Sequence, residues 1–136
     1  MFASSKKKIS VVVSKLQKCG IIVSLFVDPN LNQIRSAAET GADFIELHTG
    51  VYAQLFSRRF QSALKDLEKA AVYAHSLGLR VNAGHGLNYE NVKPVAALPY
   101  MEELNIGHSI IARTVFVGMR NAVREMVKLI HQAKSR

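Results

Sequence analysis

Short apolar runs alternate with longer helical repeats along this 136-residue chain, and this alternation constrains the fold more than any other feature. Four runs have the length and apolar content of buried strands. They cover residues 21–28, 43–48, 79–83 and 103–106. The segments around them repeat apolar residues every three or four positions, as amphipathic helices do. These helices are expected over residues 5–18, 31–40, 52–77, 91–98 and 115–133.

The order of these segments, one helix and then strand and helix four times, predicts an α/β fold. Near-continuous apolar strands that alternate with amphipathic helices form parallel sheets with helices packed on them. With 49% hydrophobic and 21% charged residues, the chain has the composition of a globular protein. No linker or low-complexity tract interrupts it, so residues 1–136 are expected to form a single domain.

The net charge of +8 is concentrated at the two ends of the chain. Residues 1–18 and 113–136 each carry +5, whereas residues 19–112 carry −2. A nucleic-acid surface has clustered Lys and Arg, commonly with aromatic residues or a recognition motif, and solvated helix faces explain this pattern better. No apolar run has the length that crosses a membrane. The single cysteine, Cys19, allows no internal disulfide, which favours a reducing cytoplasm.

Charged residues, histidines or glycines stand where each predicted strand ends. Asp28 closes the first strand, Glu46 and His48 close the second, and residues 84–86 and 107–109 follow the third and fourth. Because the carboxyl ends of parallel strands open onto one face, these residues are expected at one rim. Glycines let a ligand approach the backbone closely, and the loops after the last strands of (β/α)8 barrels commonly bind phosphate. A phosphate ester is therefore the expected ligand.

Four segments, in this order, resemble the successive motifs of the pyridoxine 5′-phosphate synthase family. They are residues 23–29 (VSLFVDP), 45–53 (IELHTGVYA), 81–87 (VNAGHGL) and 104–113 (LNIGHSIIAR). The resemblance extends over residues 8–131 and implies the (β/α)8 TIM-barrel family, with this chain similar to its C-terminal half, strands five to eight. The expected architecture is a four-strand parallel half-barrel with an N-terminal helix.

This resemblance implies an enzyme, a transferase of vitamin B6 biosynthesis that condenses 3-amino-2-oxopropyl phosphate with 1-deoxy-D-xylulose 5-phosphate. The products are pyridoxine 5′-phosphate, phosphate and water, and no metal or organic cofactor is needed. By match to the family's motifs, His85 is the general acid and Glu46 is the carboxylate that stabilises charge. Gly86, Gly107 and His108 bind the substrate, mainly its phosphate. An imidazole that titrates near neutrality and backbone N–H groups that suit a dianion agree with these roles.

Structural interpretations of the same residues stay open. His85 can cap a glycine turn, and His108 is dispensable if backbone N–H groups alone hold the phosphate. Glu46 can form a salt bridge in the barrel mouth, and Asp28, just before Pro29, is read first as a residue that shapes a turn.

Two more residues are undecided, and a metal site is a further alternative. His48 is equally a rim residue or a support for a neighbour, and Arg113 serves either packing or a phosphate. Zinc accepts ligands such as Glu46, His48, His85 and His108, but the flanking glycines and the family resemblance argue against a metal.

The family's first half supplies further substrate-binding and basic residues that this chain lacks, so we expect the chain to be inactive alone. Three functions follow: an enzyme half that works when the N-terminal half is supplied, a non-catalytic remnant, or a basic assembly or nucleic-acid-binding protein. Four strands taken from a closed barrel have two open edges, and we also expect one uncovered apolar face. The chain is therefore expected to form a homo-oligomer or to bind its missing half.

Overall fold

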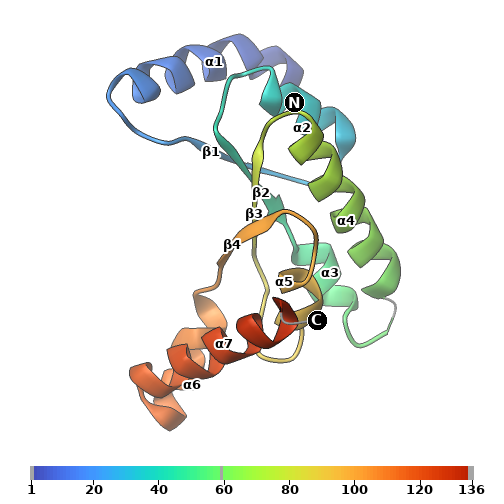
Figure 1. The fold of residues 1–136 in the computed structure, drawn as a ribbon, viewed down its shortest axis with the longest axis vertical. Helices are drawn as coiled ribbons and strands as arrows, with labels where there is room; N and C mark the ends of the chain where they lie inside the picture. Colours follow the sequence, from blue (N-terminus) through green and yellow to red (C-terminus); the bar gives the residue numbers. More distant parts are fainter. Residues whose placement is uncertain (1, 59, 135–136) are drawn as a thin grey trace.

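Four parallel strands lie side by side in the order in which they occur in the sequence (Figure 1). The computed structural model describes residues 2–58 and 60–134. The strands are β1 (Ser24–Val27), β2 (Phe44–His48), β3 (Arg80–Gly84) and β4 (Met101–Asn105). Each neighbouring pair is parallel, which confirms the predicted α/β fold and agrees with a half-barrel.

Helices precede, connect and follow these strands. Within the described residues they are α1 (Phe2–Lys18), α2 (Leu31–Ala38), α3 (Gly50–Leu55), α4 (Phe60–Ser76), α5 (Val92–Ala96), α6 (His108–Val117) and α7 (Met119–Lys134). None of them is both long enough and apolar enough to cross a membrane.

The helix expected over residues 52–77 is divided into α3 and α4. The rings of Tyr52, Phe56 and Phe60 pack together across the break, with centroids 4.8 to 6.0 Å apart. Because these aromatic residues are four positions apart, their periodicity predicts one continuous helix, although the helix is interrupted between them.

A helix that the sequence did not predict, α6, precedes the last helix, α7. Gly118, at φ +76°, separates α6 from α7. His108, which the sequence placed in a loop, is the first residue of α6. The expectation of a loop at residues 107–109 is therefore wrong after Gly107, and the cavity described below meets a helix N-terminus there.

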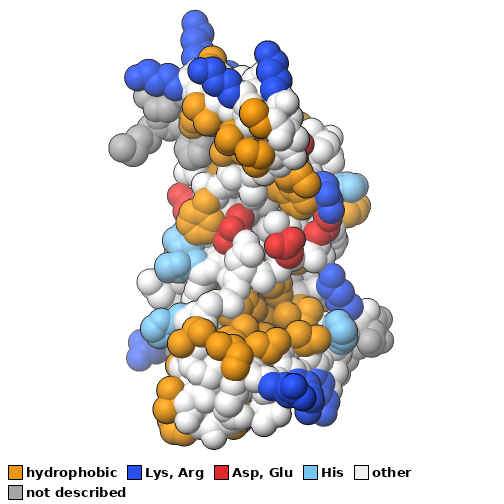
Figure 2. Space-filling view, turned by 90° about the vertical axis from the view of Figure 1, so that its left-hand side faces the viewer, with side chains coloured by type: hydrophobic (Ala, Val, Ile, Leu, Met, Phe, Trp, Pro, Cys, Tyr) orange, Lys and Arg blue, Asp and Glu red, His pale blue; other side chains and the backbone are white. Residues whose placement is uncertain are grey.

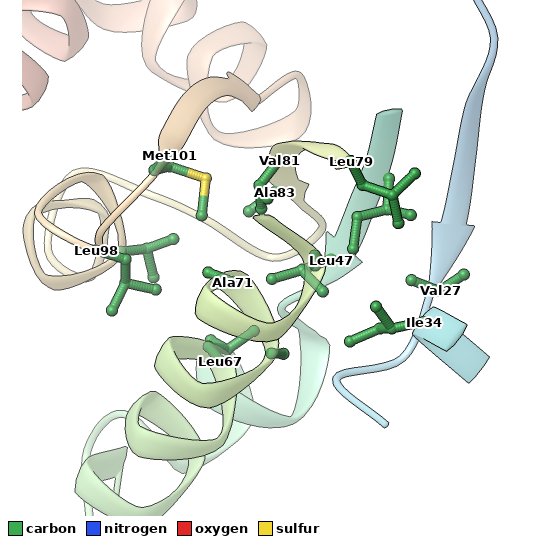
Figure 3. Close-up of a cluster of buried hydrophobic side chains, with 14 of the residues drawn as sticks. Val27, Ile34, Leu47, Leu67, Ala71, Leu79, Val81, Ala83, Leu98 and Met101 are labelled. Carbon is green, nitrogen blue, oxygen red and sulfur yellow. The ribbon is translucent and has the colours of Figure 1, made fainter. Parts of the chain in front are cut away.

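The hydrophobic core lies between the sheet and the helices that cover one of its faces (Figure 3). Along β2 and β3, every second side chain points to this side, as the pleat of a strand requires. Ile45, Leu47, Val81 and Ala83 are completely buried there, in one cluster with Leu67 of α4. The sheet is thus fixed on its helical side, and the alternate residues are left for its other face.

The opposite face of the sheet is open and mainly polar. Register places Phe26, Glu46, Asn82 and Glu103 in one row across the four strands, and only Phe26 among them is apolar. Figure 2, viewed from the side opposite α4, shows acidic and uncharged polar surface between apolar bands. The expectation of an uncovered apolar face is therefore wrong for the centre of the sheet. Asn82 is buried, and its Oδ1 has no hydrogen-bond partner among the described residues.

Large apolar side chains are exposed instead at the two ends of the molecule. One group belongs to α1 and the segment after it, and the other to α6 and α7. They include Val11, Val12, Ile21, Ile22, Ile111, Val115, Phe116, Met119, Val123 and Val127. Association with a second polypeptide stays a prediction. It would cover the apolar surface of these residues and pair the exposed edges of β1 and β4.

Asp43 joins the N-terminal helix to the sheet. Its Oδ2 accepts hydrogen bonds from the Val23 N–H at 2.8 Å and from Gln17 Nε2 at 3.1 Å. The bond from the Val23 N–H, followed by that from Gln17, holds the pKa of the Asp43 carboxyl below its ordinary value. Asp43 therefore connects α1 and β1 to the start of β2.

Replacing Asp43 with alanine is expected to lower the melting temperature at neutral pH and to matter less in acid. Since folding lowers the pKa of this carboxyl, its contribution to stability is present above the unfolded-state value and is lost as pH falls through the folded-state value. Thermal melts of D43A and the unmutated chain from about pH 7 to about pH 2 measure this loss. Asp66→Ala, on an exposed position of α4, is the control. A difference that does not shrink in acid contradicts this role.

Candidate functional site

A cavity of about 670 Å³ lies at the carboxyl ends of the strands. It is lined by residues of β1, β2 and β4 and of the segments that follow β3 and β4. They are Phe26, Glu46, His85, Gly86, Leu87, Asn88, Asn105, Ile106, Gly107, His108 and Ser109. Glu46, His85, Gly86, Gly107 and His108, the five residues that the sequence singled out, all belong to this set. They come from three separate strand ends, so parallel pairing brings them together.

Glu46 reaches across the open face of the sheet from β2. Its Oε2 accepts a hydrogen bond from Asn105 Nδ2 of β4 at 2.8 Å, although β3 lies between the two strands. Gly84 of β3 makes this possible, because a Cβ at that position would overlap Glu46 Oε1. Because Gly84 has no side chain, the Glu46 carboxylate can lie over β3.

The turn after β3 has an uncommon backbone conformation. His85 has φ +85° although it is not a glycine, and Gly86 follows with φ +77°. A positive φ costs a histidine free energy, which surrounding contacts must offset, and such strain clusters at functional sites. A Cβ on Gly86 would lie 2.8 Å from the Cβ of Ala53, so this glycine is required by space as well as by φ. The turn presents the exposed His85 side chain at the cavity.

His48 supports the site from outside the cavity lining. Its Nδ1 lies 3.2 Å from Asp28 Oδ1, and its ring stands edge-on to that of His85, with centroids 4.8 Å apart. The ring of Phe26 packs on it at a centroid distance of 5.1 Å. Asp28 also exchanges two hydrogen bonds of 3.1 Å with Gln33, so it both shapes the turn after β1 and holds His48. This arrangement favours the supporting role for His48.

The N-terminus of α6 forms another wall of the cavity through Gly107, His108 and Ser109. The first N–H groups of a helix have no partners within the helix and carry partial positive charge. Ser109 Oγ donates a hydrogen bond to the Leu87 carbonyl oxygen at 2.8 Å, which ties this terminus to the turn after β3. Two segments rich in backbone N–H groups therefore border the same space, an arrangement that suits an anion.

Arg113 does not line this cavity. Its Nε donates to Glu125 Oε2 of α7 at 2.9 Å, and this hydrogen bond raises the pKa of the guanidinium. The contact connects α6 to α7 and favours a packing role for Arg113.

The sequence matches one family model over residues 1–132, described as "Pyridoxal phosphate biosynthesis protein PdxJ". The chain belongs to the PdxJ family. The match confirms the family resemblance seen in the four sequence motifs.

Curated relatives of this PdxJ-family chain are named pyridoxine 5′-phosphate synthase. One from Synechococcus sp. (strain JA-2-3B'a(2-13)) is 61% identical over 116 residues, 85% of this chain and 48% of the relative. One from Geotalea daltonii is 55% identical over 119 residues, 87% of this chain and 50% of the relative. One from Synechococcus sp. (strain CC9605) is 49% identical over 132 residues, 97% of this chain and 53% of the relative. The chain spans about half the length of the curated relatives it matches.

Asn105, Asn88 and Phe26 are cavity residues of this PdxJ-family chain that sequence reasoning gave no role. Asn105 had a usable signal, because it ends a strand two residues after Glu103 and therefore shares its face of the sheet. Within residues 2–58 and 60–134, no group of three or more His, Cys, Asp or Glu side chains has the arrangement of a metal site.

Gly84→Ala is expected to destabilise the chain and displace the Glu46 side chain. The added Cβ would push aside Glu46 Oε1, the end of a flexible side chain, and would lie 3.0 Å from the backbone oxygen of Asn105. The backbone cannot move as easily, and overpacking of this kind costs about 1–3 kcal/mol. Urea unfolding measures the loss. Gly107→Ala is the matched control, since an added Cβ there meets nothing within 4 Å. If both variants unfold like the unmutated chain, the backbone of β4 does not approach Gly84 as closely as described.

Proposed function

We propose that this chain forms half of a pyridoxine 5′-phosphate synthase. The complete enzyme condenses 3-amino-2-oxopropyl phosphate with 1-deoxy-D-xylulose 5-phosphate, giving pyridoxine 5′-phosphate, phosphate and water, and the proposal includes no metal or organic cofactor. The observation that carries it is the single cavity that contains Glu46, His85, Gly86, Gly107 and His108. Family membership supports the reaction, because the curated relatives bear this enzyme's name.

His85 is proposed as the general acid. Its imidazole is exposed at the cavity, where it can reach a leaving oxygen, and histidine exchanges protons near neutral pH. Glu46 is proposed to stabilise the cationic iminium that forms when an amine condenses with a ketone. Its carboxylate is held by Asn105 and faces the same cavity, so it supplies negative charge at a fixed position.

The substrate phosphate is proposed to bind between the two N–H-rich segments of the cavity. Gly86 belongs to the turn after β3, and Gly107 and His108 begin α6. Backbone N–H groups and a helix N-terminus bind phosphate without any basic side chain, which fits a cavity lined by no lysine or arginine among the described residues.

A second polypeptide segment is proposed to complete the enzyme. The cavity residues come from one side only, since they belong to the strands of this sheet, to the segments that follow β3 and β4, and to the start of α6. The free edges of β1 and β4 and the polar open face are suited to four further parallel strands. The lengths of the curated relatives, about twice that of this chain, support such a partner.

Mixing this chain with the separately produced N-terminal half of a relative is expected to give pyridoxine 5′-phosphate, whereas neither half alone forms it. Product is measured by chromatography after incubation with both substrates. If the mixture is inactive although this chain binds phosphate esters, the chain is a non-catalytic remnant. Salt-dependent DNA binding without phosphate-ester binding would instead support a basic nucleic-acid-binding protein.

In an active mixture, His85→Ala and Glu46→Gln are each expected to lower the rate at least about 100-fold, because one removes the proton donor and the other removes the negative charge. Circular dichroism checks that both variants fold. His75→Gln is the control, since His75 stacks on Tyr100 at a centroid distance of 3.8 Å and does not line the cavity. Full activity in H85A would rule out the proposed general acid.

A further inference from the structure

We propose that Thr49, assisted by Asn91, is a positioning residue that turns the N–H groups of Gly86 and Leu87 toward the cavity. The inference rests on the proposed phosphate-binding function and deepens it. It explains how a strained turn is held in the one conformation that suits an anion.

Thr49 follows β2 directly and is completely buried. Its N–H donates to the Gly84 carbonyl oxygen at 2.9 Å. Its hydroxyl oxygen lies 2.7 Å from that same oxygen and 2.6 Å from the His85 carbonyl oxygen, so its proton bonds to one or the other. Asn91, 1% exposed, donates from Nδ2 to the Gly86 carbonyl oxygen at 3.1 Å. When the Thr49 hydroxyl donates to His85 and its N–H to Gly84, these two buried residues bind three successive carbonyl groups.

This binding determines the direction of the next three N–H groups. In a trans peptide the N–H points opposite to the carbonyl of the preceding residue, and the described residues contain no cis peptide bond. The N–H groups of His85, Gly86 and Leu87 thus point away from Thr49 and Asn91. The His85 N–H faces β4, where Asn105 pairs with Gly84. The N–H groups of Gly86 and Leu87, which lie beyond the strand, have no backbone acceptor among the described residues. Since both residues line the cavity, their N–H groups are available to an anion there.

The turn needs such support because of His85. Its φ of +85° is unfavourable for a side chain with a Cβ, so without fixed contacts the turn would relax to a more common conformation. Asn91 is itself fixed, because its Oδ1 accepts the Asn88 N–H at 2.7 Å and its carbonyl oxygen accepts the Tyr52 hydroxyl at 2.7 Å. Asn91 therefore has hydrogen-bond partners of its own outside residues 85–87.

Thr40 offers a matched comparison within the same chain. It is also buried, at 4% exposure, and its hydroxyl donates to the Ala37 carbonyl oxygen at 2.6 Å near the end of α2. If Thr49 served stability alone, Thr49→Val and Thr40→Val would have the same kind of effect. A positioning role predicts that only the change at Thr49 alters anion binding.

The test uses the 136-residue chain, inorganic phosphate as the probe, and NMR spectra of the backbone N–H groups of Gly86 and Leu87. Phosphate is expected to shift both signals in the unmutated chain. T49V is expected to weaken the affinity at least about tenfold, because a buried hydroxyl donor is lost and the turn relaxes. T49S, which keeps the hydroxyl, and T40V should bind phosphate like the unmutated chain. The strong HN–Hα NOE within His85, which a positive φ produces, should weaken in T49V only.

The outcomes separate this inference from the proposed function. T49V with unchanged phosphate affinity and an unchanged His85 NOE overturns the positioning role and leaves the phosphate site in place. An unmutated chain that binds no phosphate counts against the proposed function, whereas the NOE comparison still decides whether Thr49 holds the turn. If T49V does not fold, Thr49→Ala replaces it. This variant also removes the hydroxyl donor, and affinity and NOE equal to those of the unmutated chain would again overturn the inference.

Discussion

The parallel register of β2 and β3 places His48 beside Gly84 and lets Thr49 bind the end of the neighbouring strand. The positions of Glu46 and of the turn after β3 at the cavity follow from that alignment. Because side chains alternate along a strand, a slip of one residue would turn Glu46 toward α4 and bring Leu47 to the open face. The buried residues Ile45 and Leu47 prevent such a slip, since they would have to leave the core. Hydrophobic packing on one face of the sheet thus fixes polar groups on the other.

The site also depends on what β3 lacks. Gly84 has no side chain, so the Glu46 carboxylate crosses this strand and meets Asn105 on the far side. One residue later, His85 takes a positive φ that positions its ring and the following N–H groups. Gly84 and His85 are therefore adjacent exceptions. Gly84 leaves space for the Glu46 side chain, and the carbonyl group of the strained His85 faces the Thr49 hydroxyl. Such local exceptions to ordinary backbone preference are typical of functional sites.

The sequence predicted the strands and the cavity residues well because both depend on simple rules of parallel sheets. Apolar runs become strands, and their carboxyl ends meet at one edge. It failed at α6 for a physical reason: periodicity reports which side of a helix is buried, and α6 has no buried residue among His108–Val117. The sequence also did not predict the hydrogen bond from Asn105 to Glu46. Pairing between specific side chains depends on strand register and on the space left at Gly84.

The distribution of polar and apolar surface indicates how the chain would meet a partner. Val115 and Phe116 of α6 are each 81% exposed, whereas the centre of the open face carries Glu46 and Glu103. Covering apolar surface drives association, so contact energy would come from the ends and from the free strand edges. The polar centre would then be enclosed without being filled by apolar side chains. Asn82 is already buried, and no described residue donates to its Oδ1, so a donor from across the enclosed space would satisfy it.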